Sequence, residues 1–299
     1  MSRPRSAQEL IHWLEIGGGA RWIRLAAMLA GTLALSLLVA WKQFHGPTSE
    51  ATLVQADMGR QLARGAGFST LVNYPQTVAF LNARGVRFDP RRPYPELHQA
   101  PFYSIVIAGG LRLMPGAARE ALFTTAPVPP DGFAGDYFLL GLNLVLFWLS
   151  AWLTYDLGRR LFEPRVGWLA TLALLLSVPI WQATVAVNGT PLVMALALGA
   201  FSIWHRIEIR ADATAGMRGT FVWLGSLGAV CGLLFLTEYS FGALVLVALG
   251  YAFFRFRGAA AGIAIGSIAL GFFSSVPRGS AATSPSRATR SRSRVKTWR

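Results

Sequence analysis

The sequence has 299 residues, of which 53% are hydrophobic and only 14% are charged, and its mean hydropathy is +0.43. These values exclude a soluble globular domain, because several apolar runs approach or exceed the roughly 18 to 20 residues that a helix needs to cross a bilayer. The single cysteine excludes a disulfide framework within one chain, and the four histidines show no metal-ligand spacing. We therefore predict an integral membrane protein without a metal or other cofactor.

The net charge of +14 is unevenly distributed along the chain. Residues 278–299 hold six arginines and one lysine but no acidic residue, which is half of the net charge. Much of the remainder lies in short loops between hydrophobic runs, where membrane topology accounts for it. The charge therefore indicates the lipid bilayer as a partner, and not nucleic acid.

The chain begins with a basic lead-in, residues 1–24, which we predict to be cytoplasmic. The apolar run Leu25 to Trp41 follows directly and should therefore cross the membrane outward. No small-residue cleavage site of the A-x-A type follows it, so we interpret this helix as an anchor and not as a signal peptide.

Residues 45–103 form the longest region of mixed polar and aromatic character and belong to a predicted external loop, residues 45–136. The run SEATLVQADMGRQLARGAGFST is typical of an amphipathic helix that ends at glycines. Glu50 and Asp57 are seven residues apart, so they share a face of this helix, and Arg60 and Arg64 lie close to that face. Such a group is able to bind an anionic lipid headgroup and take a proton from an acceptor, but a solvated face with ion pairs has the same pattern.

The segment PFYSIVIAGGLRLM, residues 101–114, is apolar but too short to span a bilayer, so we predict a juxtamembrane helix. Residues 115–136 are rich in proline and glycine and are predicted to be a loop. Six further apolar runs follow, at Tyr137 to Leu157, Val166 to Val187, Pro191 to Trp204, Thr220 to Leu236, Phe241 to Phe254 and Gly258 to Val276.

The loops between these runs alternate in charge. RRLFEPR, HRIEIRADATAGMR and FRFR are basic, whereas VNGT and TEYS carry no basic residue. Assigning the basic loops to the cytoplasm gives seven crossings. The sequence therefore predicts an all-α polytopic membrane protein with about seven transmembrane helices and a large first external loop that contains juxtamembrane helices.

From Pro277 the composition changes to a basic, low-complexity tail, residues 277–299, which we predict to be disordered. By the crossing count this tail emerges on the outer face, where seven cations beside a span are disfavoured. We therefore hypothesise a frameshift or a truncated gene near Val276. An authentic basic tail is the alternative, and translating the other two reading frames downstream of that codon distinguishes the two.

Several segments together resemble the GT-C class of membrane glycosyltransferases, which includes protein O-mannosyltransferases and lipid A aminoarabinose transferases. They are Ser49-Glu50 after the first helix, DMGRQLARGAGFST, HQAPFYS, LGRRLFEPRVGWLA and GLLFLTEYS. The resemblance covers about residues 25–276 and rests on the order and spacing of these segments. The sequence departs from the family pattern at Ser49, where an acidic residue is usual, and at Ala100, where a second proline is usual.

The resemblance implies an enzyme that moves a sugar from a polyprenyl-phosphate or polyprenyl-diphosphate carrier to a lipid, glycan or protein acceptor. It implies a bacterial inner-membrane location, with the active site in the first external loop on the outward face. A general base and cations for the departing phosphate are then needed. The implied catalytic residues are Glu50 and Asp57. The implied substrate-binding residues are Arg60, Arg64, His98, Gln99, Tyr103 and Glu238.

Other readings of these features stay open. His98 beside Pro101 is more typical of a turn residue than of a catalyst, and Glu238 is as typical of a helix-capping or interfacial residue as of a substrate ligand. A transporter is the alternative function, although transporters usually place charges or helix breaks near the bilayer midplane, and the predicted spans are nearly free of charge. A truncated, non-catalytic member of the glycosyltransferase family is the third hypothesis.

Overall fold

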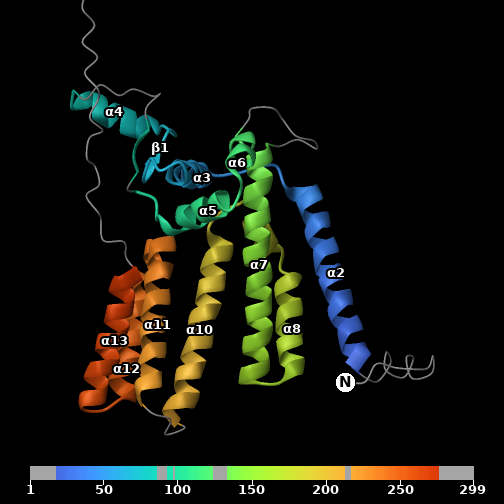
Figure 1. Ribbon diagram of the computed structural model, residues 1–299, viewed down its shortest axis with the longest axis vertical. Coiled ribbons are helices and arrows are strands. Elements are labelled where there is room, and N and C mark those ends of the chain that lie inside the picture. Colours follow the sequence, from blue (N-terminus) through green and yellow to red (C-terminus); the bar gives the residue numbers. More distant parts are fainter. Residues whose placement is uncertain (1–17, 86–92, 97, 124–132, 213–216, 276–299) are drawn as a thin grey trace, which may run out of the picture.

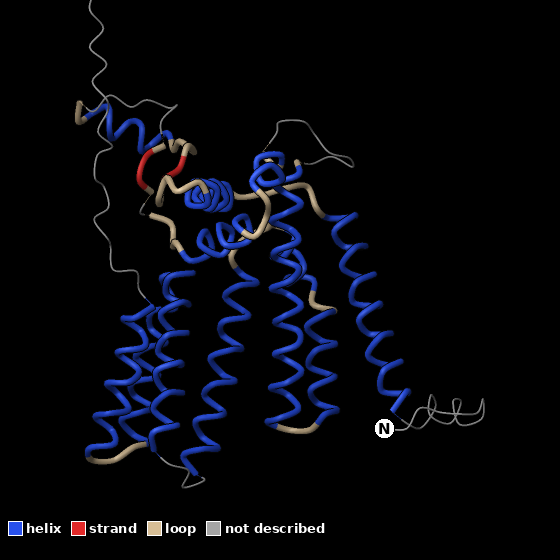
Figure 2. The backbone as a smooth tube through the Cα atoms, in the orientation of Figure 1, coloured by secondary structure: helices blue, strands red, loops and turns tan. Residues whose placement is uncertain are grey.

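The computed structural model describes residues 18–85, 93–96, 98–123, 133–212 and 217–275. These residues are almost entirely helical, and their only sheet is one antiparallel pair of two-residue strands. Figure 2 shows this pair at one end of the molecule, away from the long helices. The tail from Val276 and the first part of the basic lead-in lie outside the described residues, so the frameshift hypothesis stays a prediction.

The long helices run side by side and form the body of the molecule (Figure 1). Each corresponds to an apolar run of the sequence. They are α2 (Gly18–Gln43), α7 (Ala134–Leu161), α8 (Pro164–Leu175), α9 (Val178–Val185), α10 (Thr190–Asp212), α11 (Met217–Thr237), α12 (Ala243–Arg255) and α13 (Ala259–Ser275).

The external-loop sequence forms a second layer across one end of the long helices (Figure 1). Its helix α5 lies transversely and contacts α3, α6, α7 and α11, as the short apolar segment 101–114 led us to expect. The elements of this crossing layer are α3 (Glu50–Ala63), β1 (Ser69–Thr70), α4 (Pro75–Ala83), β2 (Tyr94–Pro95), α5 (Phe102–Arg112) and α6 (Gly116–Ala121).

Three of the described helices are long and apolar enough to cross a bilayer: α7, α10 and α11. A fourth span is formed if α8 and α9, which meet at a 56° bend, count as one. The remaining apolar helices are shorter, because residues 29–43 of α2, α12 and α13 fall below the length of a full crossing. The prediction of an all-α membrane protein is therefore confirmed in its coarse form, whereas the count of seven spans is not supported.

The described parts of the basic loops that follow α7, α10 and α12 lie at the end opposite the crossing layer (Figure 1). The α7–α8 corner carries Arg159 and Arg160, both of which pair with the buried Asp156 at 2.8 and 2.6 Å. The α12 end carries Arg255, which pairs with Glu208 of α10 at 3.1 Å. The basic loops after α7 and α12 therefore share one end of the long helices.

Two loop predictions and one span prediction were wrong in detail. The proline- and glycine-rich segment 115–136 contains a short helix, α6, before the part that lies outside the described residues. The basic segment after Trp204 is helical through Asp212, because its residues continue α10. The run Val166 to Val187 is broken into two helices, since Pro179 begins a new helical turn within it.

Glycines set the closest helix contacts in the long layer. A Cβ at Gly158 would lie 2.8 Å from Cα of Gly167, so α7 and α8 meet with almost no side chain between them. Similarly, a Cβ at Gly271 of α13 would overlap the backbone oxygen of Gly225 on α11. Small residues at such crossings are the usual means by which membrane helices approach closely, because lipid provides little hydrophobic drive for association.

Candidate functional site

Helix α3 is the element that carries most of the predicted site residues. Its N-cap is Ser49, whose side chain accepts a hydrogen bond from the backbone N–H of Thr52 at 3.2 Å. It ends before Gly65 and Gly67, whose φ angles of +83° and +75° are favourable only for glycine. The predicted amphipathic helix and its glycine stop are therefore confirmed.

The buried face of α3 packs on α5. Val54 and Met58 are fully buried, and a Cβ at Gly59 would lie 2.7 Å from the Ile107 side chain. Ser104 of α5 also donates a hydrogen bond to the backbone oxygen of Gln55 at 2.9 Å. This contact fixes how far α3 lies above the ends of the long helices, and it leaves Arg60 beside the start of α7.

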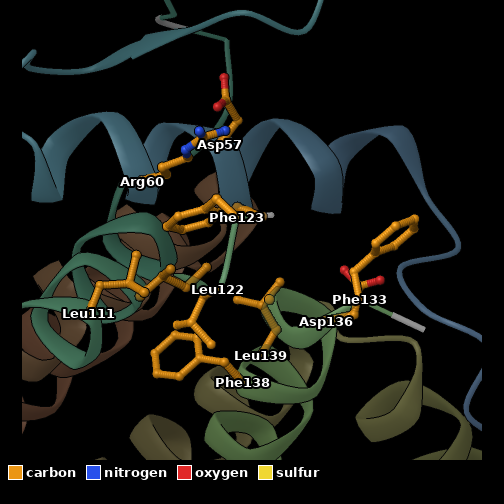
Figure 3. Close-up of a pocket in the computed structure, with 12 residues that line it drawn as sticks. Asp57, Arg60, Leu111, Leu122, Phe123, Phe133, Asp136, Phe138 and Leu139 are labelled. Carbon is orange, nitrogen blue, oxygen red and sulfur yellow. The ribbon is translucent and has the colours of Figure 1, made fainter. Parts of the chain in front are cut away.

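A pocket of about 260 Å³ lies between α3, α5, the segment after α6 and the start of α7. Figure 3 shows Arg60 on the α3 side, apolar side chains below it, and Asp136 at the other end. The lining is mostly apolar and includes Leu111, Leu122, Phe123, Phe133, Phe138 and Leu139. The pocket therefore combines an apolar wall with one guanidinium and carboxylates at its margin.

Arg60 lies over an aromatic ring. Its guanidinium carbon lies 4.3 Å from the centroid of Phe123, within cation–π range. Its Nε atom is buried and has no hydrogen-bond partner among the described residues. A buried donor without a partner costs free energy, so this atom is available for an acceptor that enters the pocket.

Arg64 has a different role from Arg60. Its guanidinium forms a two-point ion pair with Glu120 of α6, with N–O distances of 3.3 and 2.5 Å. This hydrogen bonding from Arg64 holds the pKa of the Glu120 carboxyl below its usual range. The pair connects α3 to α6 and so positions Phe123, which follows α6 directly. Arg64 is thus engaged in structure, although it was predicted to bind substrate.

Asp57 lines the pocket at its margin, but its carboxylate is already bonded. It accepts hydrogen bonds from the Thr70 hydroxyl at 3.0 Å and from the Leu71 backbone N–H at 2.6 Å. In Figure 3 the carboxylate points away from the apolar residues of the pocket. These bonds attach strand β1 and the residue that follows it to α3.

A second group of polar residues surrounds Tyr74 at the outer side of the crossing layer. Burial raises the pKa of Tyr74, a hydrogen bond with the Gln99 side chain opposes that rise, and the carboxylates of Glu96 and Glu50 add to it. Glu50 itself is exposed at the first turn of α3. The structure therefore separates Glu50 from the residues that line the pocket.

Glu96 is the residue that organises this second group, and sequence reasoning did not select it. Its side chain is buried, and Oε1 accepts from the backbone N–H of His98 at 2.6 Å and of Gln99 at 3.4 Å. The His98 side chain is exposed at the resulting turn. This arrangement matches the turn interpretation of His98.

Tyr103 and Glu238, the other two predicted substrate ligands, lie apart from the pocket. Tyr103 is fully buried, and its hydroxyl donates to Oδ1 of Asn143 at 2.8 Å and lies 3.3 Å from the backbone oxygen of Val187. Glu238 is exposed at the N-cap of the 3₁₀ turn η1 (Tyr239–Gly242). The neighbouring Tyr239 hydroxyl donates to the backbone oxygen of Gln99 at 3.5 Å. This contact places η1 beside the second group of polar residues.

Asp136 and Phe123 are the pocket residues that the sequence analysis missed. Asp136 was placed at the end of a loop, and only its position in the first turn of an apolar helix distinguishes it in the sequence. Phe123 carries no local signal, because its role depends on Arg60, 63 residues earlier in the chain. Among the described residues, no three His, Cys, Asp or Glu side chains are arranged to hold a metal ion.

No protein-family model, curated protein or solved structure matches this chain. Its function is therefore inferred from the sequence and from the geometry of the pocket.

Proposed function

We propose that this protein is a membrane glycosyltransferase that moves a sugar from a polyprenyl-phosphate or polyprenyl-diphosphate carrier to an acceptor. The observation that carries the proposal is the pocket beside Arg60, which joins an apolar wall to a buried, unpartnered guanidinium nitrogen at one end of a layer of apolar helices. A lipid-linked phosphate has the complementary character, with an anionic group directly attached to a hydrocarbon chain. The resemblance to the GT-C class is consistent with this assignment.

In the proposed reaction Arg60 binds the phosphate that leaves the sugar. A guanidinium donates two parallel hydrogen bonds to phosphate oxygens and stays charged at all physiological pH values. Packing on Phe123 at 4.3 Å fixes its orientation before substrate binds. A donor positioned in this way stabilises the negative charge that develops on the departing phosphate.

Asp136 is the carboxylate best placed to act as the general base. It lines the same pocket as Arg60 but at the opposite end in Figure 3. Among the described residues, Asp136 accepts one hydrogen bond, from the backbone of Phe133, whereas Asp57 accepts two, from Thr70 and Leu71. The acceptor hydroxyl or amine would give its proton to Asp136 and form a bond to the anomeric carbon. The bond from that carbon to the phosphate oxygen breaks, and its electron pair stays with the phosphate held by Arg60. Attack from the side opposite the leaving group inverts the anomeric centre.

The proposed enzyme has a specific membrane topology. Seven crossings, counting α2, the bent pair α8 and α9, α12 and α13, place the crossing layer on the outward face of a bacterial inner membrane. The basic corners then lie in the cytoplasm, in agreement with the positive-inside tendency. The carrier would reach the pocket from the outer leaflet.

A transfer assay on reconstituted protein tests the proposal. Proteoliposomes that contain the full chain are supplied with a radiolabelled polyprenyl-phosphate sugar and an extract of acceptor lipids and proteins. We expect transfer by the wild type and a loss of about 100-fold in Arg60→Gln, as expected when a phosphate-stabilising donor is removed. Arg112→Gln is the matched control, because Arg112 is exposed and donates only to the backbone oxygen of Leu62.

The same assay separates the carboxylate of Asp136 from that of Glu50. Asp136→Asn should abolish transfer without unfolding the protein, whereas Glu50→Gln should retain most of it. Transfer that persists in both Arg60→Gln and Asp136→Asn would exclude the pocket as the active site.

The break between α8 and α9 favours a transporter as the second candidate function. Broken helices often mark substrate sites in transporters, and here the two segments meet at 56°. Solute uptake into the same proteoliposomes, without any sugar transfer, would establish this alternative in place of the enzyme.

A further inference from the structure

The end of α10 carries two arginines that share one aromatic partner. Arg206 and Arg210 are four residues apart, so they project from the same face of the helix. Their guanidinium carbons lie 5.0 and 4.9 Å from the ring centroid of Trp223, in the second turn of α11. Trp223 is therefore within cation–π range of two guanidinium groups, at the end of α10 and α11 opposite the crossing layer (Figure 1).

The charge of this pair is not balanced within the described part of the chain. None of the ion pairs formed between described residues includes Arg206 or Arg210, and the nearby Glu208 is engaged with Arg255 at 3.1 Å. Two like charges at this spacing repel one another. An anion between them would remove that repulsion and gain hydrogen bonds from both guanidinium groups.

The α7–α8 corner at the same end provides a comparison. There, Arg159 and Arg160 are also adjacent, but both pair with the buried carboxylate of Asp156. That corner therefore has its own carboxylate, Asp156. Among the residues that the structure describes, no carboxylate pairs with Arg206 or Arg210. The two basic clusters therefore differ, because only the α7–α8 corner has a carboxylate paired with its arginines among the described residues.

The surroundings of the pair match the boundary between lipid headgroups and acyl chains. Tryptophan and arginine are the residues that commonly lie at this level of a bilayer. Exposed apolar side chains adjoin both partners in sequence: Ile209 is 55% exposed and Val222 is 69% exposed. They continue into the apolar surface of α10 and α11, where acyl chains would lie.

We propose that Arg206 and Arg210, oriented by Trp223, bind the phosphate of an anionic phospholipid in the leaflet opposite the candidate pocket. Each guanidinium donates two hydrogen bonds to phosphate oxygens, and the acyl chains lie along α10 and α11. This site is independent of the proposed glycosyl transfer, because it shares no residue with the pocket. A phosphate-bearing lipid is favoured over a soluble phosphate, since the site adjoins apolar surface on helices long enough to span a membrane.

Native mass spectrometry of the full chain in detergent tests this site. The protein is titrated with phosphatidylglycerol and, separately, with phosphatidylcholine. We expect the wild type to prefer phosphatidylglycerol, and Arg206→Gln/Arg210→Gln to bind it about tenfold more weakly, since charge-assisted phosphate contacts are lost. Lys42→Gln/Arg84→Gln is the charge-matched control, because both side chains are exposed at the crossing-layer end, and it should bind as the wild type does.

Further variants separate a defined site from general attraction. Arg206→Lys/Arg210→Lys keeps the charge but loses the planar, stacked geometry, so it should recover only part of the affinity. If the double glutamine variant does not fold, the exposed Arg210→Gln alone should still weaken binding severalfold. Equal loss in the Lys42→Gln/Arg84→Gln control, full affinity in Arg206→Gln/Arg210→Gln, or displacement of the lipid by millimolar inorganic phosphate would overturn the proposal.

Discussion

Asp57 and Arg60 are three residues apart on α3, and the structure gives them different tasks. Asp57 attaches β1 to the helix through Thr70 and Leu71, whereas Arg60 lies on Phe123 inside the pocket. The side-chain types alone allow either residue to be catalytic. Their neighbours distinguish them, because the Asp57 carboxylate already accepts two hydrogen bonds, whereas the Nε atom of Arg60 has no hydrogen-bond partner among the described residues.

Tyr103 provides a residue-scale test of structure against substrate binding. In Tyr103→Phe the hydroxyl that donates to Asn143 at 2.8 Å is lost, and burial excludes contact with a ligand in solution. We expect a loss of stability of about 1 to 2 kcal/mol, seen as a lower Tm in detergent. Sugar transfer per folded molecule should be unchanged. A loss of sugar transfer at an unchanged Tm would instead indicate that Tyr103 binds substrate.

At the scale of elements, the fold depends on two kinds of contact. The long helices meet through glycines, whereas the crossing layer is joined by polar bonds between elements that are distant in sequence, such as Arg64 with Glu120. The stability of the glycine contacts depends on side-chain volume, whereas the stability of the ion pairs depends on pH.

Two glycines of α13 give a matched test of the first kind. Gly271→Ala places a Cβ against the backbone oxygen of Gly225, so α11 and α13 must separate, at a cost of about 1 to 3 kcal/mol. Gly266→Ala, on the same helix, meets nothing within 4 Å and should be neutral or stabilising by up to about 1 kcal/mol. Thermal unfolding of the two variants measures the difference, and equal Tm values would contradict the close helix contact.

The Arg64–Glu120 pair predicts a pH response of α6. The pKa of Glu120 is lowered in the folded protein, mainly by its hydrogen bonds from Arg64. The contribution of the pair is therefore complete above the ordinary carboxyl pKa of 4.5 and is lost as the pH falls through the lowered value. Hydrogen exchange of α6, corrected for its intrinsic pH dependence, should rise in that acidic range. Glu120→Gln should already exchange rapidly at neutral pH and show no such step.

For the whole molecule, the arrangement of a crossing layer on one end of a helical layer predicts membrane sidedness. Asn73 lies in the crossing layer and Glu163 at the α7–α8 corner, and both are exposed. Asn73→Cys should react with an impermeant thiol reagent on intact cells, whereas Glu163→Cys should react only after permeabilisation. The native Cys231 is buried and should remain silent. Labelling of both positions from outside would contradict the proposed orientation.

Local signals in the sequence are enough to predict most of the helices and their approximate ends. Apolar runs predict helices, and the N-cap Ser49 and the glycines after Ala63 mark the two ends of α3. The apolar segment that begins at Phe102 is too short to cross a bilayer. These signals are local, because helix formation and burial in lipid depend on neighbouring residues and on length.

The set of side chains that share the pocket becomes apparent only in the folded structure. Arg60, Phe123 and Asp136 come from three segments, and nothing in the sequence around Phe123 or Asp136 indicates that they meet. Conversely, Asp57, Arg64 and Tyr103 were predicted from the sequence to be site residues, yet the side chain of each bonds to another part of the fold. The physical reason is that the availability of a charged or polar group depends on what packs against it in space, and sequence spacing fixes this only within a single helix.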